Sequence, residues 1–491
     1  MLDLRDWLEQ LDSMGKLKVV KGLHWDMEIS IAADFVTRRG HLPYLPKEGN
    51  RRFSWEGRGG RGGPGALLFD DIVGYPNGYR VFGGGTTPPR LTARLMGIPE
   101  TDSAREVTQA VRQKLPEWEA SLTKFEPKVV KTGPILENVD SGKDVDLFKF
   151  PAPKWHGLDG GRYIGTSDAV ITQDPDTGEI NIGTYRIQVH DDKTVALYIS
   201  PGHHGRLHYE KYHARGEACP VAISVGQHPL IGGLAASPLP FGTEYNLMGA
   251  ISGEPVSVIK EEVTGLPIPA ASEIVIVGWC PPDEERVEGP FGEWPGYYSQ
   301  YGPCPIVKVE RIYYRNNPII CGGGGGPLMG LANAMTLNKL EKAGIPDIRG
   351  VASSDFANQM WIVVSIKQRY GGHARQAALA LSGAYIGRYV IVVDDDIDPT
   401  NIREVLWAIC TRSDPEKDID FIRGAWSSPL DPTIRKPRKS WESSRAIIDA
   451  CKPFEWIDEY PAEIEVNPEQ VERVRQKLQA SEASPTAARA A

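Results

Sequence analysis

The chain has 491 residues and a formal net charge of -9 at pH 7, which offers no basic surface of the kind that binds nucleic acid. No uninterrupted apolar run reaches the roughly 18 residues of a membrane span. The six cysteines have no C-x-x-C spacing, which predicts reduced thiols in a cytoplasmic protein rather than a disulfide framework or a zinc site. The length predicts two or three domains.

Residues 1–120 are predicted to form an N-terminal α/β region. The opening stretch MLDLRDWLEQLDSMGKL alternates acidic and apolar residues at helical spacing, and Ser103 and Glu106 have the spacing of a capping box at the start of a second helix. The segment GRGGRGGPG at 57–65 is predicted to be an exposed loop. The alternative, that its arginines contact phosphate, lacks the flanking strand and helix of a phosphate-binding loop.

Residues 121–320 contain short β-rich runs separated by Gly, Pro and Asp. They include DAVITQ, YRIQVH, VALYIS, VAISVG, EIVIVGW and PIVKVERIYY. This spacing predicts a twisted antiparallel sheet or a small barrel. The run CGGGGGP at 321–327 follows, and it is not a Walker loop because no Gly-Lys-Ser/Thr comes after it.

Residues 321–450 are predicted to form a C-terminal α/β domain. MWIVVSI at 360–366 and RYVIVVDDDID at 388–398 are apolar runs that alternate with helical stretches. An apolar run that ends in acids and leads into a helix, as at 388–398, is typical of a buried parallel strand. In the last segment, 451–491, Asn467 and Pro468 predict the start of a final helix. The small and polar stretch ASEASPTAARAA is predicted to be disordered. The overall fold class is therefore α/β (α+β).

Three polar residues between 181 and 244 form a candidate metal site. Asn181 precedes a predicted hairpin, His204 lies in the turn that follows it, and Glu244 lies on a loop shaped by Pro and Gly. Amide, imidazole and carboxylate ligands suit Mn²⁺ or Mg²⁺ better than structural zinc. The alternative is a structural role for each residue, such as capping a turn.

A second candidate site combines Arg186 with the two acids of EGPFGE, Glu288 and Glu293. If Glu288 pairs with Arg186, the charged form of Glu288 is favoured and the direction of the guanidinium is fixed. Glu293 stands beside Phe291 and Trp294, where desolvation would raise its pKa and keep it able to carry a proton. Such a pair supplies a fixed counter-ion and a proton donor. The alternative is that both glutamates lie on the surface.

Five segments of the chain together resemble the UbiD family of non-oxidative decarboxylases, which use prenylated flavin mononucleotide (prFMN). They are DGGRYIGTSDAVITQDPDTGEINIGTYRIQVHDDK, SPGHH, EGPFGE, YRNNPI, and VIVVDDDID followed by VLWAICTRSDP. They occur in family order, and the resemblance extends to about Pro437. It implies a split β-barrel flavin-binding domain at 121–320 and a dimerisation domain at 321–450.

The resemblance also implies roles for individual residues. Arg186, Glu288 and Glu293 match the catalytic Glu-Arg-Glu set, in which the arginine orients the substrate carboxylate, the flavin acts as electron sink and Glu293 returns a proton. Asn181, His204 and Glu244 match the ligands of a divalent metal that bridges to the flavin phosphate, with K⁺ nearby. The implied cofactor contacts are Asn181, Ile182, Arg186, His203, His204, Ser237, Glu244 and Arg388.

Two positions depart from the family pattern. Some members contact the flavin phosphate through a lysine before the last α/β strand, whereas this chain has Ser382 near that place and Arg388 as the nearest base. His203 stands where other members carry glutamine. The phosphate contact and the contact of His203 with the cofactor are therefore the least supported of the implied set.

The implied substrate is a planar aromatic, heteroaromatic or α,β-unsaturated acid. Trp294, Trp426 and the glycine run before Leu328 would form a flat apolar slot if they face the flavin, and the alternative is that both tryptophans are core residues. A UbiX-type prenyltransferase would supply the cofactor, and the chain is expected to form homodimers or hexamers. Two other functions stay open: an FMN-dependent oxidoreductase and a non-catalytic subunit.

Overall fold

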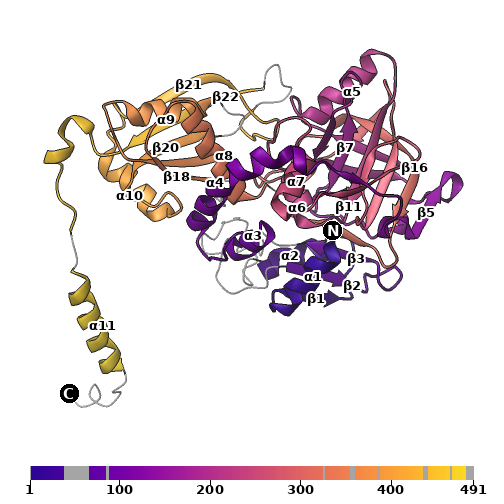
Figure 1. Cartoon of the computed structure of the whole chain (residues 1–491), viewed down its shortest axis with the longest axis horizontal. Helices are drawn as coiled ribbons and strands as arrows, with labels where there is room; N and C mark the ends of the chain where they lie inside the picture. Colours follow the sequence, from indigo (N-terminus) through magenta and orange to yellow (C-terminus); the bar gives the residue numbers. More distant parts are fainter. Residues whose placement is uncertain are drawn as a thin grey trace.

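The computed structural model describes residues 2–37, 66–83, 88–323, 327–353, 360–383, 387–434, 441–464 and 467–482. A large body holds the N-terminal and middle parts of the chain, and a smaller α/β unit formed by the C-terminal part lies beside it (Figure 1). The glycine-rich segment at 57–65 and residues 483–491 lie outside the described residues, so the predictions for them stay predictions. Residues 480–482, the start of the stretch predicted to be disordered, are instead the last residues of a helix.

The N-terminal region contains a four-stranded sheet in the order β1-β2-β3-β17. Its strands are β1 (Leu17–Lys21), β2 (Ala66–Asp70), β3 (Arg80–Gly83) and β17 (Ile319–Gly322), and its helices are α1 (Leu4–Ser13) and α2 (Glu28–Thr37). In α1, Leu4, Trp7, Leu8 and Leu11 are buried, as expected for one apolar face of a helix. Strand β17 follows the middle sheet in sequence and pairs in parallel with β3, which ties the N-terminal sheet to the rest of the body.

The middle of the chain forms a ten-stranded antiparallel sheet. Its strands are β5 (Asn138–Ser141), β6 (Arg162–Gly165), β7 (Ala169–Gln173), β8 (Ile180–Gly183), β9 (Arg186–Asp191), β10 (Thr194–Tyr198), β11 (Cys219–Val225), β14 (Ile274–Cys280), β15 (Glu285–Glu288) and β16 (Gly302–Tyr314). The main order is β6-β9-β10-β16-β14-β11-β7-β8, and β5 and β15 both pair with β16.

The order of the strands shows that this sheet is strongly curved. Strand β8 lies at one end of the order and β9 is next to the other end, yet only Thr184 and Tyr185 separate them in sequence. The two ends of the sheet must therefore approach each other, which gives a half-barrel. The predicted split barrel is confirmed.

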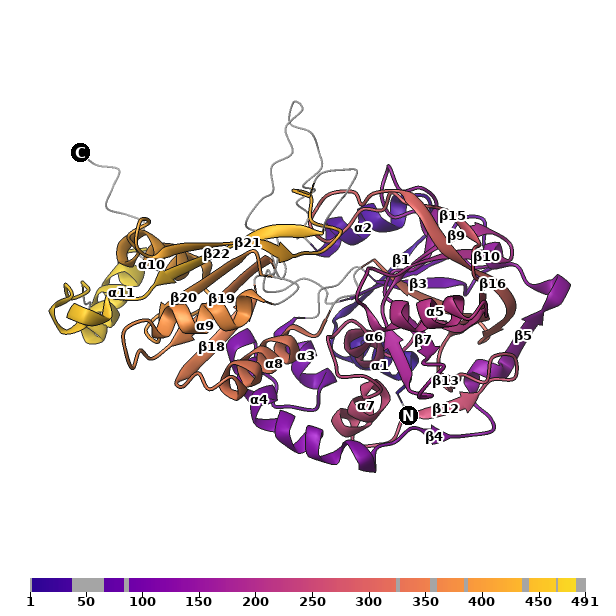
Figure 2. The same ribbon diagram turned by 90° about the horizontal axis from the view of Figure 1, so that it is seen from above.

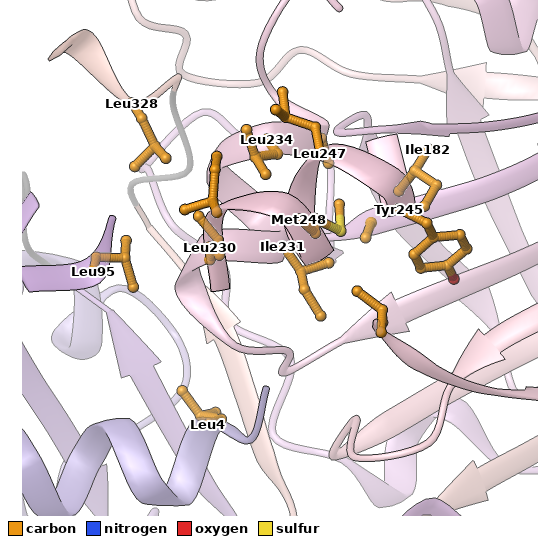
Figure 3. Packing of buried hydrophobic residues seen from close by; sticks show 14 of the residues in the cluster. Leu4, Leu95, Ile182, Leu230, Ile231, Leu234, Tyr245, Leu247, Met248 and Leu328 are labelled. Atoms are coloured by element: carbon orange, nitrogen blue, oxygen red, sulfur yellow. The ribbon is translucent and has the colours of Figure 1, made fainter. Parts of the chain in front are cut away.

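Three helices cover the barrel close to β8. They are α5 (His204–Ala214), α6 (Pro229–Ala235) and α7 (Glu244–Ser252). Leu230 and Ile231 of α6, Met248 of α7 and Ile182 of β8 belong to one buried cluster. Figure 3 shows these side chains gathered between the two helices and the strand. Burial of these groups fixes the start of α7, where Glu244 lies, relative to β8.

The C-terminal unit is a five-stranded sheet in the order β18-β19-β20-β22-β21, with helices on both faces (Figure 2). Its elements are β18 (Ile348–Ser353), β19 (Trp361–Ile366), β20 (Tyr389–Asp394), β21 (Ile419–Trp426), β22 (Glu442–Ala450), α8 (Met329–Lys342), α9 (His373–Ser382) and α10 (Ile402–Arg412). The three inner strands, β19, β20 and β22, are parallel. Strands β19 and β20 are buried, as their apolar sequences predicted, whereas β22 was not predicted.

The remaining elements include α3 (Pro89–Leu95), α4 (Ala104–Ser121), a small sheet of β4 (Lys128–Val129), β12 (Ser257–Lys260) and β13 (Pro267–Pro269), and α11 (Pro468–Glu482). The predicted helix starts are confirmed, because Ser103 accepts the amide of Glu106 and Asn467 accepts the amide of Glu469. Helix α11 stands away from the C-terminal unit (Figure 1). Within the described ranges, no helix is both long and apolar enough to cross a bilayer.

Candidate active site

Arg186 is held between the two glutamates of the EGPFGE segment. It is the first residue of β9, Glu288 is the last residue of β15, and Glu293 lies in the turn that follows. Nε and Nη2 of Arg186 donate to the two carboxylate oxygens of Glu288, both at 2.7 Å, and Nη1 donates to Oε1 of Glu293 at 2.7 Å. The predicted ion pair with Glu288 is present, and the pair with Glu293 is an addition to it.

Burial and charge act on this arginine in opposite directions. Arg186 is 7% exposed and Glu288 is 2% exposed, which excludes the surface alternative for Glu288. Desolvation by itself would lower the pKa of Arg186, but the hydrogen bonds and charge of Glu288 and the charge of Glu293 raise it above its usual value. Arg186 is therefore a fixed cation at any physiological pH.

The remaining surface of the guanidinium is also defined. Cζ of Arg186 lies 3.8 Å from the ring centroid of Tyr198 on β10, so an aromatic ring covers one face. Three of the five N–H groups bond to Glu288 and Glu293. Among the described residues, one N–H on each terminal nitrogen has no acceptor, which leaves two donors for an anionic group.

Asp159 fixes the turn that carries Glu293. Its side chain is buried, Oδ1 accepts the amide of Gly292 at 2.9 Å, and Oδ2 accepts the amides of Trp155 and His156 at 3.1 and 2.8 Å. One carboxylate thus joins two loops that are far apart in sequence. The position of Glu293, directly after Gly292, follows from this contact.

Glu244 is a buried carboxyl group at the first residue of α7. It is 4% exposed, and desolvation raises its pKa to about 7, although its own amide and the amide of Ile182 donate to it and partly oppose the shift. At physiological pH, a carboxyl group with this pKa populates both its neutral and its charged form. A nearby cation would hold it in the charged form.

Asn181 and His204 approach Glu244 from two other elements. Asn181 is 3% exposed, and its amide donates to the hydroxyl of Tyr185 at 3.5 Å; the same hydroxyl accepts the amide of Gly205 in the first turn of α5 at 3.3 Å. His204, the first residue of α5, stacks on Phe241 with ring centroids 3.4 Å apart. Phe241 precedes Glu244 by three residues, so β8, α5 and α7 bring the three predicted ligands to one region.

The chemistry of these donors is compatible with a hard divalent cation. Burial lowers the pKa of His204, which keeps its imidazole neutral and able to coordinate. No group of three or more His, Cys, Asp or Glu in a metal-binding arrangement occurs in the part of the chain that is described. The predicted set contains only one His and one Glu beside Asn181, so metal binding there stays a prediction.

Comparison with known proteins places this arrangement in a family. The model described as 3-octaprenyl-4-hydroxybenzoate carboxy-lyase Rift-related domain (UbiD) matches residues 128–327, and the corresponding C-terminal domain matches residues 327–450. Together they cover more than half of the chain. The chain belongs to the UbiD family.

Curated relatives of this UbiD-family chain match nearly its full length. A phenolic acid decarboxylase from Sedimentibacter hydroxybenzoicus is 32% identical over 92% of this chain and 92% of its own length. A pyrrole-2-carboxylic acid decarboxylase from Pseudomonas aeruginosa is 31% identical over 92% of this chain and 91% of its own length. The family models and these relatives establish the chain as a carboxy-lyase and disfavour the oxidoreductase and non-catalytic alternatives.

Solved UbiD-class structures share the whole fold. The enzyme HmfF from Pelotomaculum thermopropionicum in complex with FMN has a TM-score of 0.79 at 26% identity and covers 96% of this chain and 98% of its own. An evolved dimeric form of that enzyme in complex with prFMN has a TM-score of 0.77 at 25% identity over 96% and 98%. A vanillic acid decarboxylase from S. hydroxybenzoicus, in closed form, has a TM-score of 0.77 at 29% identity over 99% of both chains.

Three further residues implied by the UbiD resemblance lie close to β8. Ile182 donates its amide to Glu244. His203 is the residue before α5, and its ring meets Tyr185 edge to face at a centroid distance of 6.0 Å. Ser237 follows α6 and donates its hydroxyl to the carbonyl of Gly233 at 2.8 Å. Their contacts with a cofactor stay predictions.

Arg388 has a strong partner within the C-terminal unit of this UbiD-family chain. It forms an ion pair with Asp431, whose carboxylate is fully buried, and its Nη2 donates to the hydroxyl of Thr433 at 3.1 Å. Although desolvation opposes it, the hydrogen bond and charge of Arg388 lower the pKa of Asp431 to about 2. A phosphate contact through Arg388 would therefore have to compete with this carboxylate. Ser382, at the end of α9, donates to Ala378.

The two tryptophans named from the sequence are not core residues. Trp294 is half-buried, and Trp426 at the end of β21 is 42% exposed. A β-carbon placed on Gly202, in the turn before His203, would lie 3.3 Å from Cη2 of Trp426. The C-terminal unit therefore contacts the SPGHH turn of the barrel domain through Trp426.

Sequence reasoning missed the residues that support this UbiD-family site. They are Asp159, Tyr163, Tyr185, Gln188 and Tyr198. Alternation along a strand could have placed Gln188 and Tyr198 relative to Arg186, because side chains two apart on β9 share a face and Tyr198 is opposite Arg186 on β10. No spacing in the sequence relates Asp159 or Tyr163 to a turn more than a hundred residues away.

Proposed function

We propose that this protein is a prFMN-dependent decarboxylase of an aromatic, heteroaromatic or α,β-unsaturated carboxylic acid, and that it also catalyses the reverse carboxylation at high CO₂. The observation that carries the proposal is the buried guanidinium of Arg186, which is held by Glu288, contacts Glu293 and keeps two N–H donors for a carboxylate. Such a site can bind a carboxylic acid and, after CO₂ leaves, protonate the carbon that carried the carboxylate.

Each member of the set has a distinct task in the proposed reaction. Arg186 binds and orients the substrate carboxylate, and Glu288 fixes the direction of the guanidinium by its two hydrogen bonds. Glu293 contacts the same guanidinium, so it would stand next to the bound carboxylate. In its protonated form it delivers a proton to the carbon that loses CO₂ and then takes up another proton from solvent. The half-buried aromatic residues around the turn limit access of water.

The residues present fit the cofactor that the family implies. Asn181, His204 and Glu244 would hold a divalent cation such as Mn²⁺ beside the flavin phosphate, because the buried Glu244 lacks a cationic side-chain partner among the described residues. The prenylated flavin, when bound, would supply the electron sink for decarboxylation. Expectations of K⁺ and of the contacts from Ile182, His203, Ser237 and Arg388 rest on the resemblance.

The proposed substrate class rests on relatives and on the aromatic residues of this chain. Relatives named for phenolic, vanillic and pyrrole-2-carboxylic acids all act on planar ring acids. Trp294 and Trp426 are accessible and come from different units, so they would flank a flat ligand better than a flexible one.

Partners and location are also proposed. A UbiX-type prenyltransferase would make the cofactor, and the protein would act in the cytoplasm, where its six free cysteines would stay reduced. A homodimer or hexamer is supported by α11, which exposes Val471, Val474 and Leu478 at i, i+3 and i+7. A lone helix of this length is marginal in water, so contact with a second copy would stabilise it.

Substitution of Glu293 tests the proposal. In protein co-expressed with a flavin prenyltransferase, Glu293→Gln should retain its flavin but release CO₂ from aromatic acids at least about 100-fold more slowly, since a general acid contributes 10²–10⁴-fold. Glu285→Gln, on the exposed part of strand β15 before this turn, is the matched control and should keep wild-type turnover. Equal rates in the two variants would refute the assigned role, and flavin reduction with NADH consumption would favour an oxidoreductase.

A further inference from the structure

Tyr163 and Gln188 form a cross-strand pair beside the Arg186–Glu288 ion pair. Strands β6 and β9 are antiparallel, with Tyr163 directly opposite Gln188. Residues opposite each other in such a pair share one face of the sheet, and so do residues two apart on a strand. The pairing therefore places Tyr163, Gln188 and Arg186 on the same face.

The two members of the cross-strand pair bind two consecutive residues of the EGPFGE segment. The hydroxyl of Tyr163 donates to Oε1 of Glu288 at 2.9 Å, and Oε1 of Gln188 accepts the amide of Gly289 at 2.9 Å. Oε1 of Glu288 is also the oxygen that accepts Nε of Arg186. This oxygen thus has two donors, one from each strand.

Tyr163 itself is rigidly placed. It is 0% exposed, its amide donates to the carbonyl of Pro153 at 2.9 Å, and its ring lies 4.4 Å from that of Phe291, centroid to centroid. A side chain with no access to water and with packing on its ring has little freedom to rotate. The hydroxyl is therefore a fixed reference point for the carboxylate of Glu288.

We infer that Tyr163 is a positioning residue for the decarboxylation site: it fixes Glu288, and Glu288 in turn aims Arg186 at the substrate carboxylate. The two flexible side chains of the ion pair would otherwise be free to tilt together without breaking their mutual hydrogen bonds. The third contact removes that motion. This inference rests on the proposed function of Arg186 and Glu288.

The competing explanation is that Tyr163 only fills the core. Tyr163→Phe separates the two explanations because it keeps the ring and removes the hydroxyl. In prFMN-loaded protein we expect KM for an aromatic acid to rise about tenfold with a smaller change in kcat, the size expected for one hydrogen bond to a charged group. The affinity of the unloaded protein for FMN should stay within about twofold of wild type, since this hydroxyl contacts Glu288 and not the proposed cofactor residues.

Tyr313→Phe is the matched control. Tyr313 is 3% exposed, and its hydroxyl accepts a hydrogen bond from Arg311 at 2.9 Å. Like Tyr163→Phe, this substitution therefore removes the hydrogen bond between a buried tyrosine hydroxyl and a charged side chain. Its melting temperature should fall by an amount similar to that of Tyr163→Phe, with KM unchanged. If Tyr163→Phe leaves KM at the control value, the inference is overturned.

A double-mutant cycle provides the second test. In a Glu288→Gln background, Tyr163→Phe should change kcat/KM by less than about twofold. Tyr163 acts through Glu288, so the loss of its hydroxyl has no further effect once the residue at 288 no longer holds Arg186. A full tenfold effect in that background would show that Tyr163 acts independently of Glu288 and would overturn the inference. If Glu288→Gln alone keeps wild-type kcat/KM, the proposed function fails with it.

Discussion

Arg186 shows how one residue combines structure and chemistry in this protein. It is 7% exposed and is balanced by two carboxylates and an aromatic face. A buried charge is tolerated only when its partners are well placed, so the same contacts that keep Arg186 charged also determine its direction. In the proposed function, its two remaining N–H donors bind the substrate carboxylate.

Replacement of Arg186 by lysine should separate charge from geometry. Lysine keeps the positive charge but cannot form the two parallel hydrogen bonds to Glu288 and still offer two donors. We expect kcat/KM for an aromatic acid to fall at least about 100-fold, with bound flavin retained. Steady-state CO₂ release checks this. Arg206→Lys, which alters a half-buried arginine paired with Glu210, is the control and should retain activity.

Sequence alone indicated the residues of the motif better than the side chains that support them. Arg186, Glu288 and Glu293 carry a recognisable motif, and the pairing of the first two followed from simple electrostatics. Tyr163 and Asp159 bond to the same turn, but nothing in their local sequence indicates a contact across more than a hundred residues. Such contacts depend on strand order, which a single sequence does not specify.

At the scale of elements, the turn after β15 depends on one carboxylate from a distant loop. Asp159→Asn retains the size of the side chain but has a single acceptor oxygen, so the amide of Gly292 or those of Trp155 and His156 would lose their partner. We expect destabilisation of about 1–3 kcal/mol and at least a tenfold loss of kcat/KM. Asp140→Asn, at a half-buried ion pair with Lys149, should affect stability without affecting activity. Wild-type kinetics for Asp159→Asn would contradict this role.

The start of helix α6 predicts an acid-sensitive contact. His228 caps this helix by accepting the amide of Leu230, and burial lowers its pKa to about 4. In the unfolded chain His228 binds a proton below about pH 6.5, whereas in the folded chain it does so only near pH 4. The contribution of this contact to the free energy of unfolding is therefore fully present above about pH 6.5 and declines as the pH falls from about 6.5 to about 4. The loss should reach at most about 3 kcal/mol.

His228→Asn tests this contact, because asparagine caps helices well and does not titrate. The substitution also removes the ring that packs against Trp7, so we expect an offset in melting temperature that does not depend on pH. We expect the melting temperature of the variant minus that of wild type to become more positive between pH 8 and pH 5. A difference that does not change with pH would contradict the shifted pKa of His228.

Elements with a clear hydrophobic period were predicted well. The strands β19 and β20 and the helix starts at Ser103 and Asn467 occur where the sequence indicated. The position of β17 was not predicted, because Ile319–Gly322 follows the barrel in sequence but pairs with β3 of the N-terminal sheet. Local patterns indicate which residues form a strand but not which partner the strand chooses.

At the scale of the whole molecule, helix α11 stands away from the rest of its own chain (Figure 1). Ile464, just before it, is 97% exposed, and Glu463 is anchored by Arg412 and Lys452. Removal of residues 465–491 should lower the oligomer mass or weaken association, which light scattering over a concentration series would measure. Arg473→Lys is a control that leaves the exposed apolar residues Val471, Val474 and Leu478 in place. An unchanged mass after truncation would contradict contact of α11 with a second copy.

Most of the architecture of the molecule could be predicted from the sequence through its family resemblance. The half-barrel and the C-terminal α/β sheet follow the predicted order. Contacts between the units could not be predicted from the sequence, and the contact of Trp426 with Gly202 is an example. Such contacts depend on how two folded units pack, and neither local propensity nor motif spacing carries that information.

CO₂ release from an aromatic acid, measured on the same purified protein with and without prFMN, tests the central claim most directly. Protein co-expressed with a flavin prenyltransferase should show the absorbance and mass of the modified flavin and should release CO₂. Protein without the cofactor, and loaded Arg186→Lys, should release it at least about 100-fold more slowly. Equal turnover without any flavin would contradict the account.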